Sequence, residues 1–492
     1  MSLMSTRGGS WVTASQAILN GIAPDGGLYV PLMFPPMSAE SIHSMVDMTY
    51  AQRAALVLTQ FLDDYSPREL EAATATSYGP ERFGGSFPAP LRRVDDSTSM
   101  LELFHGPTFA FKDMALQLLP HLLTAAARKN GEKRQVMMVA ATSGDTGKAA
   151  LEGFRDVPGT SCTVFYPADG ISKIQRLQMV TTTGQNTRVI AVRGNFDDCQ
   201  TEVKKIFSDQ EAIQALNRRG QMFSSANSMN FGRLVPQVAY YFSAYADLLK
   251  RRIIQADEPV NFVVPTGNFG NILAAYYARN MGLPIQRLIC ASNRNNVLTD
   301  FFTQGTYSTH RLLMKSMSPS MDILVSSNLE RLLFEAADRD GALISVWMRQ
   351  LQESGSFSVG AQRRDWLNGV FYAGYANDQM TAAEIRRRFQ EDQVLMDPHT
   401  AVGSHVLNQY RLETGDKTHT VLVSTASPFK FPEDVYFSLT EKRVNDGFEA
   451  LTALAHATGE TPDAAFYRLR DLPIVHDEVC DPAEMRDFIM KG

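Results

Sequence analysis

Cysteine is scarce in this sequence. Its 492 residues include four cysteines, which lie far apart and form no CxxC pair: Cys162, Cys199, Cys290 and Cys480. This spacing argues against a disulfide framework or a cysteine-rich zinc site and favours a reducing compartment, so we expect a cytoplasmic protein. The nine histidines form no HExxH motif or similar cluster, so we expect no metal site.

Long apolar runs and basic clusters are also missing. Hydrophobic residues make up 44% of the chain, but no run reaches membrane-spanning length, so we expect no membrane partner. The formal net charge is −6, from 47 basic and 53 acidic residues, and no basic patch stands out. We therefore expect no nucleic-acid partner.

The length of the chain predicts more than one domain. We expect an N-terminal region over residues 1–95 that contains a helix at 38–62. A smaller α/β domain over 96–250 and a larger one over 251–492 follow, and the larger one carries a helical insertion at about 306–393.

Several short apolar segments show no polar alternation, as is typical of strands buried on both faces. They are residues 100–104, 135–141, 162–166, 189–192, 261–264, 287–291 and 420–423. Helical patterns separate them. The segment over 108–129 is expected to be a loop and then a helix that is interrupted or bent near Pro120. This alternation predicts an α/β fold with mostly parallel strands covered by helices.

One lysine, Lys112, lies in a mostly apolar segment, HGPTFAFKDMALQ at 105–117. If its side chain is buried, desolvation favours the neutral amine, which is the form that makes Schiff bases with carbonyl groups. The alternative is a solvated lysine on a helix that begins near Pro107, paired with Asp113.

The strand expected at 261–264 runs into a Gly/Asn-rich loop and then a helix. Backbone amides and the helix dipole can bind an anion at such a junction. The loop contains no lysine, which suits a phosphate that is anchored rather than transferred; its residues are Gly267, Asn268, Phe269, Gly270 and Asn271. An ordinary turn between strand and helix is the alternative.

Two further loops offer hydroxyls and amides. The loop at 142–147, before a helix expected from Lys148, suits a carboxylate through Ser143, Asp145 and Thr146, although Asp145 would repel an anion unless it caps the helix facing away. Simple capping of the helix by Asp145 or Thr146 is the alternative. The segment at 224–233 suits a doubly charged phosphate through Ser225, Asn227, Ser228, Asn230 and Arg233, with a helix cap and a solvated arginine as the alternative.

The end of one strand and the start of one helix supply the last candidate site residues. Thr425 follows the strand expected at 420–423 and could offer a neutral hydroxyl to a ring nitrogen. Asp397 and Pro398 have the pattern of a helix start, so we assign His399 to capping or packing rather than chemistry.

Nine motifs follow one another over nearly the whole chain: STRG at Ser5, APDGGLYVP at Ala23, HGPTFAFKD at His105, ATSGDTG at Ala141, SANSMNFGR at Ser225, PTGNFGN at Pro265, ASNRNNVLTDFF at Ala291, SMDILVSSNLERL at Ser320 and DPHTAVG at Asp397. In these motifs and in their order, the chain resembles the threonine synthase family. The resemblance implies a pyridoxal 5'-phosphate (PLP)-dependent enzyme of the tryptophan-synthase-β type (fold type II). Such an enzyme has two open, mostly parallel sheets built from non-contiguous segments.

The resemblance also implies roles for the candidate residues. Lys112 would be the Schiff-base lysine, Gly267 to Asn271 would bind the cofactor phosphate, and Thr425 would face the pyridine nitrogen. The loop at 142–147 would hold the substrate carboxylate, and the segment at 225–233 the substrate phosphate. The implied reaction converts O-phospho-L-homoserine and water to L-threonine and phosphate by γ-elimination and β-addition, in a monomer or homodimer.

One motif departs from the family pattern. Many members have histidine in a TAHPxKF motif, whereas this chain has TASPFKF with Ser427. Related phospho-lyases carry serine there and release 2-oxobutyrate, ammonia and phosphate, so that activity is an alternative. The chain could also be a serine or threonine dehydratase, or a binding protein that has the fold without catalytic activity.

Overall fold

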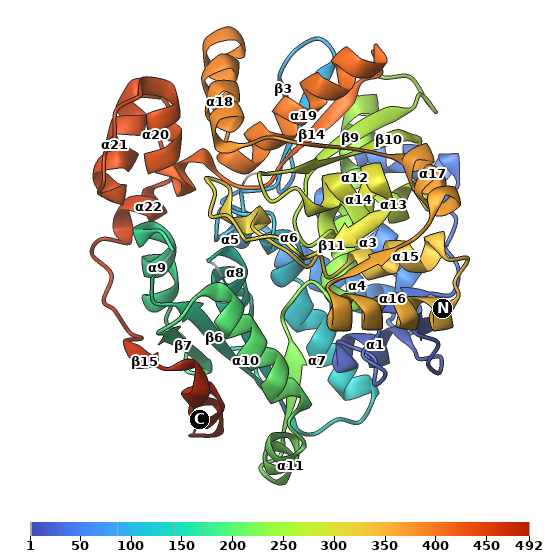
Figure 1. The fold of residues 1–492 in the computed structure, drawn as a ribbon, viewed down its shortest axis with the longest axis vertical. Helices are drawn as coiled ribbons and strands as arrows, with labels where there is room; N and C mark the ends of the chain where they lie inside the picture. The colour runs from blue at the N-terminus through green and yellow to red at the C-terminus, as the bar shows by residue number, and fades with distance from the viewer. Residues whose placement is uncertain (1, 86, 143, 170, 492) are drawn as a thin grey trace.

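The computed structural model describes residues 2–85, 87–142, 144–169 and 171–491. It contains two open sheets, each covered by helices, and Figure 1 shows the two halves one above the other. The expected α/β class with mostly parallel strands is therefore confirmed. Within the described ranges, no helix is both long and apolar enough to cross a membrane.

The larger sheet has six strands, parallel except for one edge pair. Their order is β13 (Phe371–Tyr375), β10 (Ile285–Ser292), β9 (Val260–Pro265), β14 (Thr420–Ser424), β4 (Thr98–Glu102) and β3 (Leu91–Arg93). Side chains of β9 alternate between two apolar clusters: Phe262 and Val264 belong to one, and Val263 to the other. Because successive side chains point to opposite faces, both faces of this sheet are buried.

The smaller sheet has five strands, and all of its pairs are parallel. Their order is β15 (Glu478–Cys480), β7 (Thr187–Val192), β6 (Thr160–Pro167), β5 (Gln135–Ala141) and β8 (Gln221–Ser225). Met138 of β5 faces the cluster that includes α8, and Met137 and Val139 face the cluster that includes α10. Because both faces of β5 are buried, its sequence shows no alternation of polar and apolar residues.

Helices cover both sheets. Those around the smaller sheet are α7 (Leu119–Lys129), α8 (Asp145–Phe154), α9 (Lys173–Val180), α10 (Phe196–Ser208), α11 (Gln210–Arg218) and α23 (Met485–Lys491). The larger half contains α12 (Phe231–Lys250), α13 (Gly270–Asn280), α14 (Val297–Gln304), α15 (Leu329–Ala336), α16 (Gly341–Ser354), α17 (Ala361–Val370), α18 (Asp378–Asp392), α19 (Pro398–Thr414), α20 (Pro432–Thr440), α21 (Gly447–Thr458) and α22 (Ala464–Arg468).

The N-terminal region forms a small pair of strands and several helices that pack against α12 and α7. Its elements are β1 (Leu3–Ser5), α1 (Ala14–Asn20), β2 (Tyr29–Pro31), α2 (Ala39–Ser44), α3 (Tyr50–Phe61), α4 (Pro67–Ser77) and α5 (Pro80–Phe83). A 3-10 turn, η1 (Met45–Asp47), and two non-helical residues separate α2 from α3, so the single helix expected at 38–62 is two helices. The capping hydroxyl of Thr49, which accepts a hydrogen bond from the Gln52 amide, starts the second one.

The apolar segments expected to be strands are all strands, but the sequence patterns missed several others. The strands β3, β8, β13 and β15 were not predicted, and β13 lies in the segment expected to be helical, together with the short pair β11 (Thr306–Ser308) and β12 (Ser356–Ser358). All of these are only 3 to 5 residues long, which is too short for a periodic pattern to show.

The sheets also cross the expected domain ranges. Strand β4, placed in the smaller domain at 96–250, lies in the larger sheet between β14 and β3. Strand β15, at the C-terminal end of 251–492, pairs with β7 of the smaller sheet. Figure 1 shows the chain running from α22 down to β15. Pairing between strands distant in sequence sets these boundaries, and local composition carries no signal of it.

Candidate active site

Lys112 lies directly before a one-turn helix, α6 (Asp113–Leu116), where the two halves of the molecule meet. Only 11% of its side chain is exposed, and its Nζ lies 4.8 Å from the centre of the Phe111 ring. Asp113 accepts hydrogen bonds from Thr108 and has no ion pair with Lys112 in the described structure. The alternative of a solvated lysine paired with Asp113 is therefore wrong.

The end of β14 holds the lysine segment in place. The amide of Phe111 donates to the carbonyl of Thr425 at 2.8 Å, and the amide of Ser427 donates to the carbonyl of Phe109 at 3.1 Å. Phe109 has a positive φ of 58° and stacks on Phe466 of α22 with ring centroids 4.3 Å apart. These contacts place Thr425 beside the segment that carries Lys112, although the two are more than 300 residues apart in sequence.

The loop before α13 has the features of an anion cradle. Phe269 adopts a left-handed conformation with φ 63°, and no side chain among the described residues caps the helix that starts at Gly270. The Oδ1 atom of Asn271 accepts hydrogen bonds from two tyrosine hydroxyls, but its buried Nδ2 has no partner among the described residues. A Cβ on Gly267 would approach the Ser320 carbonyl to 3.0 Å, so this loop also touches the segment at 316–322.

The loop at 142–147 is closed by Thr142, whose hydroxyl accepts from the amides of Gly144 and Gly147. Helix α8 begins at Asp145, three residues before the expected start, and its N-cap is Gly144, which makes no side-chain bond. The half-buried Thr146 lies in the first turn. Ser143 lies outside the described residues.

Asp145 faces two lysines and does not cap its helix. Its Oδ1 lies 2.7 Å from Lys430 Nζ, and its Oδ2 lies 3.6 Å from Lys112 Nζ. Burial alone would raise the pKa of Asp145, but Lys430 and Lys112 together hold it well below its usual range. An ionised carboxylate that is already bonded cannot itself bind a substrate carboxylate.

The segment at 225–233 meets the anion cradle from the other side. Asn328 donates both to the Ser228 hydroxyl and to the Asn268 carbonyl, at 2.9 Å each. Ser225 accepts from the amide of Asn227. Asn230 is fully buried, caps α12 and donates to the Ile18 carbonyl, so its side chain is already used within the fold.

Arg233 is 3% exposed and only partly bonded. Its Nη1 donates a hydrogen bond to the Ala226 carbonyl, and its Nε has no partner among the described residues. Burial lowers the pKa of Arg233 to about 10, and the guanidinium is close enough to Lys112 to help lower the pKa of that amine. The alternative of a solvated arginine is therefore wrong.

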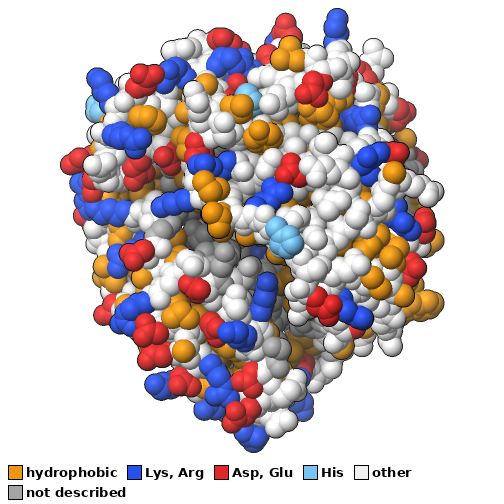
Figure 2. Space-filling model, in the orientation of Figure 1, with side chains coloured by type: hydrophobic (Ala, Val, Ile, Leu, Met, Phe, Trp, Pro, Cys, Tyr) orange, Lys and Arg blue, Asp and Glu red, His pale blue; other side chains and the backbone are white. Residues whose placement is uncertain are grey.

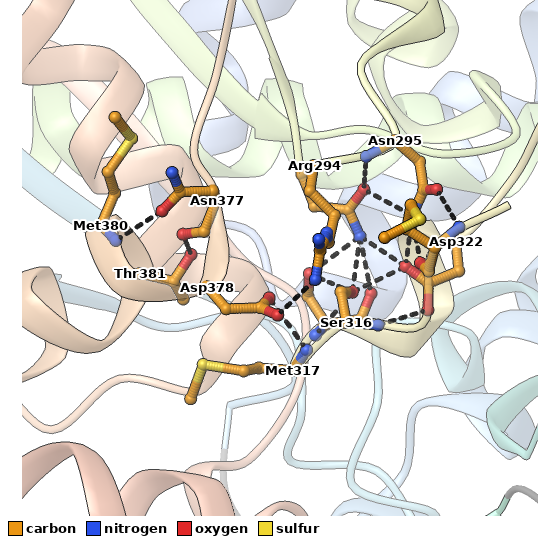
Figure 3. Close-up of polar contacts among 12 residues, drawn as sticks. Arg294, Asn295, Ser316, Met317, Asp322, Asn377, Asp378, Met380 and Thr381 are labelled. Atoms are coloured by element: carbon orange, nitrogen blue, oxygen red, sulfur yellow. Dashed lines mark hydrogen bonds and ion pairs between the residues drawn. The ribbon is translucent and has the colours of Figure 1, made fainter. Parts of the chain in front are cut away.

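A loop at 314–322, which we call the strap, lies against this site and was not predicted from the sequence. Asn293 and Asn295 donate to Asp322 Oδ1 at 2.7 and 2.8 Å, and Ser316 donates to the same atom. Figure 3 shows Asn295 and Ser316 beside Asp322, and the bonds of Asp378, at the start of α18, to Arg294 and to the Met317 amide.

The tip of the strap reaches the site. Ser320 donates through Oγ to Asp145 Oδ2 at 2.9 Å, and its amide donates to Nε2 of His399 at 3.2 Å. His399 is 2% exposed, its Nδ1 bonds Asp397, and its ring lies against Phe431. Asp397 caps α19 with Pro398 in the first turn, so the predicted helix start is confirmed. The assignment of His399 to capping or packing stays a prediction.

Lys430 was also missed. It lies in a 3-10 turn, η3 (Pro428–Lys430), with a fully buried side chain. Its place in the sequence TASPFKF, as a lysine among apolar residues, is the signal that could have indicated a buried charge. Figure 2 shows a hollow near the centre of this face, with Lys or Arg side chains in and beside it.

These residues fit pyridoxal phosphate. The unpaired Asn271 amide and the uncapped start of α13 suit a phosphate, and the largely buried Lys112 amine suits an aldehyde. Three family models match the chain: "Threonine synthase N terminus" at 2–78, "Pyridoxal-phosphate dependent enzyme" at 98–426 and "Threonine synthase, C-terminal" at 400–470.

Individual relatives agree. A Pseudomonas aeruginosa protein named threonine synthase is 40% identical over 88% of this chain and 90% of its own. A Macaca fascicularis protein named threonine synthase-like 1 is also 40% identical over 88% of this chain, which spans 58% of that relative's length. The crystal structure of PLP-bound threonine synthase from Brucella melitensis has 35% identity and a TM-score of 0.88, covering 100% of this chain and 99% of its own.

The two-sheet fold and the buried lysine between its halves define a pyridoxal-phosphate-dependent enzyme of the α/β class. Within that class, the matches at both ends of the chain and the identity to the bacterial relative place it further. The chain belongs to the threonine synthase family.

Proposed function

We propose that the chain is a threonine synthase that converts O-phospho-L-homoserine and water to L-threonine and phosphate. Arg233 is the observation that carries this proposal. A buried guanidinium whose Nε has no partner in the described structure is costly unless an anion completes it. A phosphate ester on a substrate bound beside Lys112 supplies that anion, and arginine binds phosphate through paired donors.

The other residues take roles that agree with their positions. Bound pyridoxal phosphate supplies an electron sink for the substrate carbons. Lys112 tethers the cofactor and then moves protons at the α and β carbons of the substrate. The residues at 267–271 hold the cofactor phosphate, and Thr425 offers a neutral hydroxyl to its ring. The amides around Thr146 hold the substrate carboxylate.

A second activity is favoured by Ser427. Its hydroxyl accepts a hydrogen bond from the Phe429 amide and caps η3, so it is too short and already too engaged to reach far into the site. Where a longer imidazole is missing, elimination of phosphate without addition of water is the competing outcome, and the products are 2-oxobutyrate, ammonia and phosphate.

Product analysis tests the proposal. The protein loaded with pyridoxal phosphate is incubated with O-phospho-L-homoserine, and threonine, 2-oxobutyrate and phosphate are measured. We expect threonine and phosphate in equal amounts, and we expect a Lys112→Ala variant to lose at least about a thousandfold in rate because tether and proton carrier are the same group. Stoichiometric 2-oxobutyrate without threonine would establish the second activity instead.

The small-molecule substrate is the partner that we propose. We also propose a cytoplasmic monomer or homodimer. The four cysteines are buried and unpaired, which agrees with a reducing compartment.

A further inference from the structure

Lys430 is a buried charge that the proposed reaction does not use. Its side chain is fully buried, and its Nζ donates to the Thr108 carbonyl at 2.7 Å and lies 2.7 Å from Asp145 Oδ1. Thr108 belongs to the segment that carries Lys112. Lys430 therefore ties that segment to the start of α8, on the other half of the molecule.

One carboxylate faces two amines here. Asp145 already accepts hydrogen bonds from Gln175 at 3.1 Å and Ser320 at 2.9 Å. Lys430 approaches it to 2.7 Å and Lys112 only to 3.6 Å, so at equal dielectric the attraction to Lys112 is about a quarter weaker. A single buried carboxylate stabilises one ammonium. Lys430 is more deeply buried and makes the shorter contact, so it is the lysine that pairs with Asp145.

The charged groups around the two amines do not all act in the same direction, but near Lys112 the cations outnumber the anions. Burial lowers the pKa of Lys112, Asp145 opposes this, and both Lys430 and Arg233 lower it further. His399 also contributes to the low pKa of Asp145, and Asp113 faces Lys430 from α6. Lys112 is thus surrounded by more positive than negative charge.

We infer that Lys430 is a positioning residue for Lys112: it occupies the Asp145 carboxylate, so that Lys112 stays a free amine directed at the cofactor site. This inference rests on the proposed role of Lys112 as the tether. If Lys430 lost its charge, Asp145 would be left to pair with Lys112 and would hold it as an unreactive ammonium.

The test follows covalent attachment of pyridoxal phosphate to the full-length chain freed of cofactor. The rate is read from the visible absorbance at pH 6 to 10, and the site is established by borohydride reduction and mass spectrometry. We expect Lys430→Met to react about tenfold more slowly than the wild type at pH 7. The difference should shrink as the pH rises toward 10, because the amine of Lys112 loses its proton more fully in both proteins.

Three further variants separate charge from shape. Lys430→Arg keeps the charge and should stay within about twofold of the wild type at every pH. Asp145→Asn removes the carboxylate that could hold Lys112 as an ammonium, which we call the trap, and this variant should react at pH 7 at least as fast as the wild type. The double variant Asp145→Asn/Lys430→Met removes both charges and should recover most of the rate that Lys430→Met loses at pH 7. Lys148→Met, which breaks an ion pair with Glu152 on the same helix, is the matched control and should not change the pH profile.

The outcomes are distinct. A wild-type chain that attaches no cofactor at Lys112 refutes the proposed function. A wild type that attaches it, with Lys430→Met slowed by the same factor at every pH or not slowed at all, refutes only the inference. If Lys430→Met does not fold, Asp145→Asn decides: a rate at pH 7 about tenfold below the wild type would overturn the role of Asp145 as the trap.

Discussion

Arg233 offers the sharpest separation of function from stability in this molecule. Replacing it with methionine keeps the length of the side chain and removes the charge. If two charge-assisted hydrogen bonds to the substrate phosphate are lost, at about 1.5–3 kcal/mol each, kcat/KM for O-phospho-L-homoserine should fall by at least about a hundredfold. The stability of the protein should respond quite differently.

The structure predicts little loss of stability in Arg233→Met. The variant loses one hydrogen bond to the Ala226 carbonyl, about 1.5–3 kcal/mol, and no longer has to bury an incompletely bonded guanidinium, which costs several kcal/mol. These terms nearly cancel, so we expect a change within about 1 kcal/mol, measured as a shift of the urea midpoint of the cofactor-free protein.

Arg331 is the matched control because it is just as buried. Its pKa is also lowered to about 10 by burial, but its nitrogens donate to the Tyr29 carbonyl at 2.9 Å, the Met229 carbonyl at 2.7 Å and the side chain of Asn328. Arg331→Met should therefore destabilise by about 3 kcal/mol or more. Equal destabilisation of the two variants, with kcat/KM preserved in Arg233→Met, would show that Arg233 is structural and refute its role as the phosphate ligand.

Two further predictions concern the lysine segment and its neighbours. A Cβ on Gly153 of α8 would lie 2.1 Å from the Leu116 carbonyl of α6, so Gly153→Ala should destabilise the protein by about 3 kcal/mol. Gly369 of α17 faces open space, so Gly369→Ala should stabilise the protein by about 0.5–1 kcal/mol. Urea midpoints of both variants check this, and equal effects on stability would contradict it. Burial raises the pKa of Asp113 from 3.8 to about 6. Because the folded state holds this proton more tightly, the stability that Asp113 contributes falls as the pH rises from about 4 to about 6. The stability of the wild type relative to Asp113→Asn should decline over that interval and level off near pH 7, and a constant difference from pH 4 to 7 would show that Asp113 titrates normally.

Local sequence patterns were sufficient to predict several strands, loops and helix starts of this protein. The strand over Gln135–Ala141 was predicted at its full extent, because burial on both faces requires an unbroken apolar run. The Gly/Asn loop at 267–271 and the helix start at Asp397 were likewise readable, because strand ends and caps use few residue types. The apolar surroundings of Lys112 indicated that the lysine could be buried, and the ordered motifs indicated the family.

Only the tertiary structure decided which charges meet. No local pattern indicates that Lys430 and Asp145, 285 positions apart, form an ion pair beside Lys112, or that Ser320 reaches the same carboxylate. Nor does any pattern show that Asn230 is used as a cap while Arg233, three residues later, keeps an unbonded Nε. The pairing of β4 with β14 brings the segment that carries Lys112 to the end of β14, close to Lys430. Residue types and local patterns therefore indicate which groups can act, but long-range pairing fixes their distances and burial, and these set the charge of a lysine.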